Sequence, residues 1–238
     1  MSCHFSALTS LASGGKGFGS LEELVDNAIC SVRELSFDYF LYGVCNSTPF
    51  MKPDIKFLGN WPEEWAEYYK EMNCAPLDPV IQHCKVFFEP MKLPGEMFLK
   101  PLALNSKVSG FNISEGVVQP SFKASGYFGF LYLAKLSGTV SDEEFKGLKP
   151  IIRSLADTIG EQVIKLGWAS PNGELVELVE KEKEILRWVA DGKTSGEVSI
   201  ILGVAVDTVN FHLRNSQRKL GASNRVQTLT YAVANGYI

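Results

Sequence analysis

The chain has 238 residues, 45% of them hydrophobic, and a formal net charge of −4. This length suits two domains, and the hydrophobic fraction excludes an intrinsically disordered chain. The acidic balance argues against general binding of polyanions. No apolar run reaches membrane-spanning length and the N-terminus lacks a signal-peptide pattern, so we expect a cytoplasmic protein without a membrane segment.

Cysteine and histidine spacing gives no sign of a catalytic or metal site. The five cysteines are an odd number without a C-x-x-C pair, which predicts reduced thiols rather than disulfides or a zinc site. His83 and Cys84 are adjacent on a predicted helix and point about 100° apart, which argues against a thiol–base pair. With no phosphate-binding loop or metal-ligand spacing either, the sequence predicts neither an enzyme nor a cofactor.

The first two-thirds of the chain mix strand-like and helix-like segments after a small, polar, Gly-rich arm at residues 1–19. The predicted segments are a helix at 21–35, strands at 37–45 and 55–58, helices at 61–72 and 77–88, strands at 115–122 and 127–135 that turn at 124–126, and a helix from 142 to about 166. Prolines between 89 and 110 exclude one long helix there and leave that segment unassigned. The order suits an antiparallel sheet with helices on both faces, an α/β/α sandwich that can hold a small molecule.

The end of this region carries its own boundary signals. Ser141 and Glu144 form a capping box that starts the long helix, and Pro150 implies either a kink near its N-terminus or two pieces. The Ser-Pro-Asn-Gly run at 170–173 predicts a linker. We therefore expect an α+β protein with a mixed domain at 1–166, a linker at 167–175 and an all-α domain at 176–238.

The stretch from 180 to 220 contains three short helical patterns. Gly192 ends the first, Gly203 ends the second, and a short apolar turn leads into the third. The third has an apolar stripe on one side and four polar, aromatic or basic residues on another: Asn210, Phe211, Arg214 and Arg218. Two helices joined by a tight Gly-containing turn indicate a helix-turn-helix. From Lys193 onward five basic residues outnumber two acidic ones, a modest phosphate-binding footprint.

The same stretch carries an ordered set of motif residues. They are Glu182, Leu186, Trp188, Ala190, Gly192-Lys193, the Thr208-Val209-x-x-His212 run, Asn215, Lys219-Leu220 and the closing Asn235-Gly236-Tyr237-Ile238. In these residues the C-terminal part resembles the four-helix DNA-binding domain of LuxR-type transcription factors. The resemblance implies base contacts from Asn210, Phe211 and Arg214, since Arg can bond guanine and Phe can touch a thymine methyl. The phosphate contacts that we expect come from Lys193, Thr194, Thr208, Arg218 and Lys219.

Three features of this domain give further expectations. Ala205 stands where the family often has a Ser N-cap, and Asp207 is an alternative cap. Glu182 lies on the apolar stripe of its helix, so its carboxylate needs a basic partner elsewhere in the domain. The last helix has one apolar face, within 226–233, which packs on the core or, in the family, also meets a two-fold mate on DNA. A homodimer would match a palindromic operator with half-sites about one helical turn apart.

A second motif lies in the first domain: Trp61-Pro-Glu-Glu-Trp65-x-x-x-Tyr69, followed by Asp78-Pro79-Val80. It resembles the autoinducer-binding domain of the same family, which binds the polar head of an acyl-homoserine lactone. The resemblance implies bonds from the Trp65 indole to the lactone carbonyl, from the Tyr69 hydroxyl to an acyl carbonyl, and from the ligand amide to Asp78. Taken alone, Trp65 and Tyr69 also fit the core face of a helix, and Asp78 also fits a helix N-cap.

Two departures from the family pattern affect the predicted pocket. Leu93 stands where the family has a second Trp, and Tyr132 stands where it usually has a small Ser or Thr, with Phe130 on the same strand face. Trp61 stands where the family often has Tyr. The predicted ligand-binding set is Trp61, Trp65, Tyr69, Asp78, Val80, Leu93, Phe130 and Tyr132. We infer a smaller, differently shaped or more aromatic pocket, which suits a short-chain or aryl signal or a protein that works without a ligand.

The combined prediction is a transcriptional regulator of the quorum-sensing LuxR type, controlled by a small signal molecule bound in the N-terminal domain. It would act as a homodimer on palindromic double-stranded DNA, with RNA polymerase as a further candidate partner. The alternative is a LuxR-type solo regulator that is ligand-independent or senses a molecule other than a lactone. A phosphorylation-driven response regulator is disfavoured because the early chain lacks the alternation of a parallel β/α domain.

Overall fold

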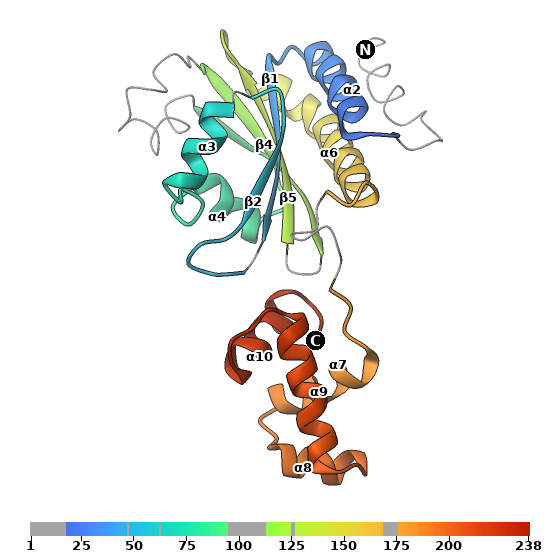
Figure 1. Cartoon of the computed structure of the whole chain (residues 1–238). Helices are drawn as coiled ribbons and strands as arrows, with labels where there is room; N and C mark the ends of the chain where they lie inside the picture. Colours follow the sequence, from blue (N-terminus) through green and yellow to red (C-terminus); the bar gives the residue numbers. More distant parts are fainter. Residues whose placement is uncertain (1–17, 47, 62, 95–112, 125–126, 169–175) are drawn as a thin grey trace. The chain divides into compact units, whose positions relative to one another are not determined.

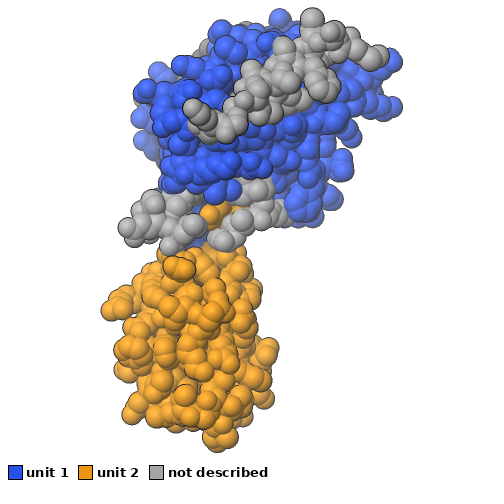
Figure 2. Space-filling view, turned by 90° about the vertical axis from the view of Figure 1, so that its right-hand side faces the viewer, with its two compact units in different colours: residues 1–123, 128–173 blue, residues 124–127, 174–238 orange. Residues whose placement is uncertain are grey.

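The computed structural model describes residues 18–46, 48–61, 63–94, 113–124, 127–168 and 176–238. The chain divides into two compact units, coloured separately in Figure 2. The first comprises Met1–Lys123 and Phe128–Gly173, and the second comprises Ala124–Tyr127 and Glu174–Ile238. The predicted N-terminal arm, part of the predicted hairpin turn and most of the predicted linker lie outside the described residues.

The first unit is a five-stranded sheet covered by helices on both faces (Figure 1). Its elements are α2 (Leu21–Glu34), β1 (Tyr39–Asn46), β2 (Ile55–Gly59), α3 (Glu63–Glu71), α4 (Pro79–Val86), β3 (Met91–Pro94), β4 (Glu115–Ala124), β5 (Tyr127–Lys135) and α6 (Asp142–Lys165). The sheet is antiparallel, in the order β2-β1-β5-β4-β3. Helices α2 and α6 lie on one face, and α3 and α4 lie on the other. The predicted α/β/α sandwich is confirmed.

Strand alternation explains why both faces of the sheet are apolar. In β1, Leu41 and Cys45 point into the core under α3 and α4, whereas Tyr42 points toward α6. The Tyr42 hydroxyl donates to Ser121 Oγ at 3.0 Å, and that hydroxyl donates to the carbonyl of Ala156 in α6 at 3.1 Å. Burial raises the pKa of Tyr42, so the phenol keeps the proton that it donates to Ser121 in β4, and the Ser121 hydroxyl in turn ties the sheet to α6.

Helix α6 runs unbroken from Asp142 to Lys165 with Pro150 inside it, so the two-piece alternative is wrong. It begins as predicted, because the Ser141 hydroxyl accepts from the backbone N–H of Glu144 at 3.1 Å. An internal proline costs a helix about 3 kcal/mol. A long buried face, which includes Leu148 and Ile152, outweighs that cost through tertiary packing.

The sequence left β3 unassigned. This four-residue strand pairs with β4 at the edge of the sheet, with Met91 opposite Val118 and Pro94 opposite Glu115. An edge strand tolerates proline because one of its sides needs no ladder hydrogen bonds. The rest of the unassigned segment falls within residues 95–112, which lie outside the described residues.

Gly43 in β1 makes room for a large ring. A Cβ on Gly43 would lie 2.2 Å from the ring of Phe130 in β5. We expect Gly43→Ala to lower the free energy of unfolding by roughly 1–3 kcal/mol, because the ring cannot leave a packed core without strain. Urea denaturation measures this. The control is Gly147→Ala in α6, where a Cβ would meet nothing within 4 Å; it should stabilise the helix by roughly 0.5–1 kcal/mol. Equal stability of Gly43→Ala and the unmutated chain would mean that Phe130 moves freely.

From residue 176 to the C-terminus the second unit is all-helical, as predicted. Its helices are α7 (Glu180–Ala190), α8 (Ser195–Leu202), α9 (Val206–Lys219) and α10 (Arg225–Ala234). Gly203 ends α8 at a φ of 63°, and α9 departs from α8 at 112°. The apolar stripes of α7, α8 and α9 meet in one core through Ile185, Val189, Val198 and Val209.

None of the described helices is by itself long and apolar enough to cross a bilayer. The bent pair α8–α9 together meets the length and composition criteria, and only those, for a membrane span interrupted by a bend.

Candidate functional site

Six aromatic side chains meet between the sheet and α3. We call them the aromatic cluster: Tyr39, Phe57, Trp61, Trp65, Tyr69 and Tyr132. Ring centroids lie 4.9 Å apart for Trp65–Tyr69, 5.6 Å for Trp61–Trp65 and 5.1 Å for Trp61–Tyr132. Phe57 lies 5.3 Å from Trp65 and 5.2 Å from Tyr69, edge to face. The structure therefore brings four residues of the predicted ligand-binding set together with Tyr39 of β1 and Phe57 of β2, which the sequence did not single out.

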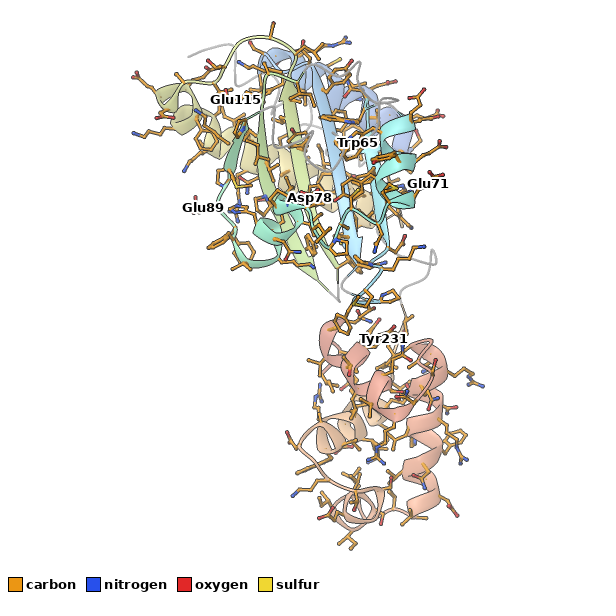
Figure 3. The ribbon with its side chains drawn as sticks, turned by 90° about the vertical axis from the view of Figure 1, so that its left-hand side faces the viewer. Trp65, Glu71, Asp78, Glu89, Glu115 and Tyr231 are labelled. Carbon is orange, nitrogen blue, oxygen red and sulfur yellow. The ribbon has the colours of Figure 1, made fainter. Side chains whose placement is uncertain are left out.

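Asp78 places a carboxylate against this cluster. Its Oδ2 accepts from the Tyr69 hydroxyl at 2.6 Å, and its Oδ1 accepts from the backbone N–H of Val80 at 2.8 Å. It is also the N-cap of α4, so the capping interpretation is confirmed. Burial raises the pKa of Asp78, although its hydrogen bonds lower it in part. Burial and the Asp78 charge raise the pKa of Tyr69, which stays a hydrogen-bond donor. Figure 3 labels Asp78 and Trp65.

The remaining predicted pocket residues surround the same place. Val80, Leu93 and Phe130 are buried in the core that contains the aromatic cluster. Cys45, Cys74 and Cys84 belong to this core as free thiols. Burial raises the pKa of Cys45 to about 11, so this thiol stays protonated and unreactive. All eight residues predicted for ligand binding thus border one side of the sheet.

A cavity of 180 Å³ reaches Tyr69 from the connection between β1 and β2. It is lined by Lys52, Pro53, Asp54, Ile55, Tyr69, Lys70, Asn73 and Ala75. Most of these residues come from the loop before β2 and from the end of α3. Sequence reasoning missed them because no local pattern shows that these two segments meet.

Helix α9 presents the second set of predicted residues. Thr208, Phe211, Arg214 and Arg218 are exposed, and Asn210 is half-buried. Phe211 is 55% exposed, which is unusual for so large an apolar ring. Val209 and Ser216 are buried on the opposite side of the helix. An exposed stripe with an amide, an aromatic ring and guanidinium groups therefore runs along α9.

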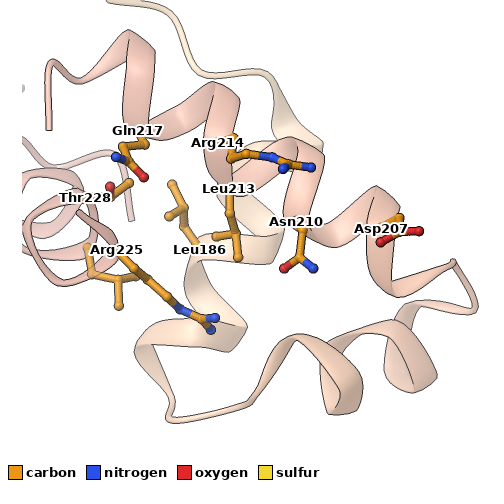
Figure 4. A pocket seen from close by; sticks show the side chains of 9 residues that line it. Leu186, Asp207, Asn210, Leu213, Arg214, Gln217, Arg225 and Thr228 are labelled. Atoms are coloured by element: carbon orange, nitrogen blue, oxygen red, sulfur yellow. The ribbon is translucent and has the colours of Figure 1, made fainter. Parts of the chain in front are cut away.

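A pocket of 320 Å³ lies between α7, α9 and α10 (Figure 4). It is lined by Leu186, Asp207, Asn210, Leu213, Arg214, Gln217, Arg225, Thr228 and Leu229. Figure 4 shows Arg214 extending along α9 in the direction of Asp207, with Asn210 between them. Asp207 and Gln217 were not among the predicted site residues.

The start of α8 is held by polar contacts within the domain. Thr194 is the N-cap, and its backbone N–H and hydroxyl both donate to Glu197 Oε2 at 2.8 Å. These bonds lower the pKa of Glu197, so a carboxylate already lies at this helix N-terminus. Arg225, which the sequence did not single out, donates to the carbonyl of Lys193 at 3.3 Å and to Ser195 Oγ at 3.2 Å.

The N-cap of α9 is Ala205, and its side chain makes no capping hydrogen bond. Asp207 lies inside the first turn, so the alternative in which it caps the helix is wrong. A carboxylate there still favours the helix N-terminus through the helix dipole.

Glu182 has the basic partner that its buried position required. Its Oε2 lies 2.8 Å from the Lys219 ammonium and accepts from the backbone N–H of Val179 at 3.0 Å. Lys219 also donates to the carbonyl of Glu177 at 3.1 Å. The expectation for Glu182 is confirmed, and the Lys219 ammonium is engaged inside the domain.

We expect Lys219→Ala to destabilise the second unit by roughly 2–4 kcal/mol, because it leaves a buried carboxylate without its cation. The Glu182 side chain is 3% exposed, whereas that of Lys219 is 32% exposed, which moderates the loss. The matched control is Lys181→Ala, which removes an equally short but half-exposed ion pair with Glu184 and should cost at most about 1 kcal/mol. Thermal unfolding of both variants checks this; equal midpoints would contradict it.

Comparison with known proteins covers both units. A family model described as "Autoinducer binding domain" matches residues 20–163, and one described as "Bacterial regulatory proteins, luxR family" matches residues 176–232. The chain is 43% identical to the transcriptional activator protein PhzR of Pseudomonas fluorescens over 221 residues, 92% of this chain and 90% of PhzR. The crystal structure of Escherichia coli SdiA has a TM-score of 0.79 at 27% identity, covering 98% of both chains. SdiA in complex with octanoyl-rac-glycerol has a TM-score of 0.78 at 27% identity, covering 99% of this chain and 96% of the other.

These matches bear out the function predicted from the motifs. Members of the family regulate transcription through the helix-turn-helix, respond to an autoinducer rather than use a cofactor, and are not enzymes. With a helix-turn-helix that binds DNA and a sensor domain that binds a small signal, the chain belongs to the LuxR family of quorum-sensing transcriptional regulators.

Proposed function

We propose that the aromatic cluster and Asp78 bind a short-chain or aryl acyl-homoserine lactone. The observation that carries this proposal is the 2.6 Å bond between the Tyr69 hydroxyl and the Asp78 carboxylate beside Trp65. A carboxylate buried among aromatic rings suits a ligand that brings its own N–H donor. We assign residues 1–166 to the sensor domain, 167–175 to the linker and 176–238 to the DNA-binding domain.

When a ligand binds, Tyr69 and Asp78 can exchange their mutual hydrogen bond for bonds to the ligand, so that neither side chain is left without a partner. A carboxylate has about four lone-pair positions, of which Asp78 uses one for Tyr69 and one for Val80. A third can accept the amide N–H of the ligand. The Tyr69 hydroxyl can then turn from Asp78 to the acyl carbonyl, while the Trp65 indole donates to the lactone carbonyl.

Side-chain volume supports a short or flat acyl group. Tyr132 is nearly fully buried where the family usually has a small Ser or Thr, and Phe130 is buried on the same strand face. The Trp61 ring lies 5.1 Å from that of Tyr132. SdiA, the relative with octanoyl-rac-glycerol bound, accepts an acyl chain on a polar head that is not a lactone. The acyl group, rather than the polar head, is therefore the part of the ligand that Phe130 and Tyr132 select.

For the second unit we propose a homodimer on a palindromic operator. Asn210, Phe211 and Arg214 read base edges, and the phosphate contacts come from Lys193, Thr194, Thr208 and Arg218. Lys219 was predicted among these contacts, and its bond to Glu182 supports a structural role instead. The regulator acts in the cytoplasm, where its DNA lies, and RNA polymerase is a further partner.

A second candidate is a solo regulator that folds without a lactone. The observation in its favour is the packing of the Trp61 ring against both Trp65 and Tyr132 in the core that also contains Tyr69. In this case the aromatic cluster itself completes the core that a ligand completes in other members.

The thermal midpoint of the purified chain separates the two. It is measured alone and with N-butanoyl-, N-hexanoyl- and N-dodecanoyl-homoserine lactone. A ligand at a hundredfold excess over its Kd stabilises the folded chain by about 2.7 kcal/mol. We expect a rise with the short chains and a smaller rise with the long one. No shift with any chain length would favour the solo regulator.

A further inference from the structure

We propose that Asp207 reads a base: its carboxylate accepts a hydrogen bond from an exocyclic amino group in the major groove, cytosine N4 above all, at a base pair other than the one that Arg214 reads. This inference rests on the proposed DNA-reading role of α9.

The first support is the position of Asp207 on α9. At about 100° per residue, it falls within roughly 40° of Phe211, Arg214 and Arg218 and opposite the buried Val209 and Ser216. It is exposed, and it lines one pocket together with Asn210 and Arg214. It also lies in the first turn of α9, and the N-terminal residues of a recognition helix are the ones that contact base edges.

The second support is that no side-chain contact within the domain engages Asp207. Among the residues that the structure describes, its carboxylate forms no ion pair and no hydrogen bond. From Lys193 to the C-terminus the only other acidic residue is Glu197, whose carboxylate is held by Thr194. Asp207 is thus the carboxylate on this basic surface that remains free to meet an external donor.

A carboxylate on a DNA-facing helix raises sequence specificity rather than overall affinity for DNA. Near phosphates it is repelled, which weakens binding to unrelated DNA. Next to a base amino group it accepts a hydrogen bond, and cytosine N4 is the donor that Asp and Glu recognise in the major groove. Specificity rises because the wrong sequence leaves the carboxylate desolvated and unpaired.

Asp207 and Arg214 lie far enough apart along α9 to contact two different base pairs. Asp207 and Arg214 are seven positions apart on α9, so their Cα atoms are separated by about 10 Å along the helix axis, which corresponds to about three base-pair steps. A carboxylate that reads cytosine and a guanidinium that reads guanine can therefore act on different base pairs of one half-site.

The experiment is selection from a random-sequence duplex pool by the full chain, with and without N-hexanoyl-homoserine lactone. Wild type, Asp207→Asn and Arg214→Ala are compared, and affinity for the enriched site and for unrelated duplex is measured. For Asp207→Asn we expect the preference for cytosine at one position per half-site to relax toward adenine, because the amide can both accept and donate at an adenine edge, and affinity for unrelated duplex to rise. The ratio of specific to unrelated affinity should fall about 5- to 100-fold, since one mismatched base pair typically costs roughly 1–3 kcal/mol. Arg214→Ala should change the base preference at a different position of the half-site.

Two control variants separate base reading from helix stability and from net charge. If Asp207 only stabilised the start of α9, adding a hydroxyl cap in Ala205→Ser/Asp207→Asn would restore the wild-type profile; a base reader is not rescued in this way. Glu71→Gln removes the same charge from exposed α3 and should leave the profile unchanged.

The outcomes separate this inference from the proposed function. If wild type enriches no sequence in either condition, DNA reading by α9 fails and the inference fails with it. If wild type enriches a site and Asp207→Asn yields the same profile and ratio, or Ala205→Ser rescues them, only the role of Asp207 is overturned.

Discussion

Replacing Asp78 by Asn is expected to abolish the response to an acyl-homoserine lactone while the ligand-free sensor stays folded. The Asn oxygen can keep the N-cap bond to Val80, and its amide can donate to the Tyr69 oxygen in place of the 2.6 Å bond that Asp78 accepts. The same amide then faces the N–H of the ligand, donor against donor. Losing a charged acceptor and burying two donors together should weaken binding by about 100-fold.

Thermal shift measures this effect directly. At a lactone concentration that stabilises the unmutated chain by about 2.7 kcal/mol, a hundredfold weaker Kd leaves about 0.4 kcal/mol. Asp54→Asn is the matched control, since Asp54 is exposed and lines the neighbouring cavity beside Tyr69; its shift should equal that of the unmutated chain. An undiminished shift for Asp78→Asn would show that the ligand does not use this carboxylate.

A second variant at this position separates fold from function. Asp78→Ala removes the N-cap of α4, worth about 1 kcal/mol, and leaves the buried Tyr69 hydroxyl without its acceptor, worth roughly 1–3 kcal/mol. We therefore expect Asp78→Ala to unfold more easily than Asp78→Asn even though both lose the ligand. Equal stability of the two variants would mean that the bonds of Asp78 contribute little to the fold.

The pH dependence gives an independent readout of the same carboxyl. Its pKa is raised by burial, so between the ordinary carboxyl pKa of about 4 and the raised value the folded chain holds a proton that the unfolded chain has lost. By linkage, this group makes the ligand-free chain less stable as pH rises through that window. Asp78→Asn lacks the titration. As pH rises through this window, the free energy of unfolding of the unmutated chain should therefore fall relative to that of Asp78→Asn. Above the window the difference between the two should stay constant.

Local patterns predicted the α/β/α sandwich and the all-α helix-turn-helix fold, because helix and strand periods and short motifs are properties of neighbouring residues. Glu182 is an instructive case. A carboxylate on an apolar stripe needs a cation, so the need for a partner could be predicted, although its identity could not. Lys219 and Arg218 look alike in sequence, and only the packing of α7 on α9 shows which of the two is engaged inside the domain.

Features that depend on segments meeting in space could not be predicted. Phe57 joins the aromatic cluster because β2 pairs with β1 in a register that sets it opposite Gly43, and that glycine also admits the Phe130 ring. The strand β3 could not be predicted because it lies in a proline-rich segment. Prolines argue against a strand unless it is known to lie at the edge of a sheet. Pro150 left open whether this segment forms one kinked helix or two pieces, and the long buried face of α6 explains why it forms one helix.

Replacing Arg214 by Ala is expected to cost operator affinity roughly 1–3 kcal/mol for each half-site, or about 5- to 100-fold per recognition helix. The guanidinium is exposed on the outward stripe of α9 and, within the described residues, forms no ion pair inside the domain. Its removal should therefore leave the fold intact. Because Arg can bond both O6 and N7 of guanine, the loss should appear as relaxed discrimination at one base pair per half-site. Fluorescence anisotropy with the enriched operator and its single-base variants measures both effects.

Arg218→Ala, one turn further along α9, is the matched control. Among the residues that the structure describes, the Arg218 guanidinium donates a hydrogen bond only to Asn215 Oδ1, at 3.3 Å, and the side chain is exposed. If it contacts phosphate, its loss weakens all sequences alike and lowers the salt slope by about one. The pair of variants thus separates base reading from phosphate binding on the same helix, with the same residue type. Uniform weakening by Arg214→Ala, without a change in base preference, would remove Arg214 from the bases and leave the reading of the operator to Asn210, Phe211 and Asp207.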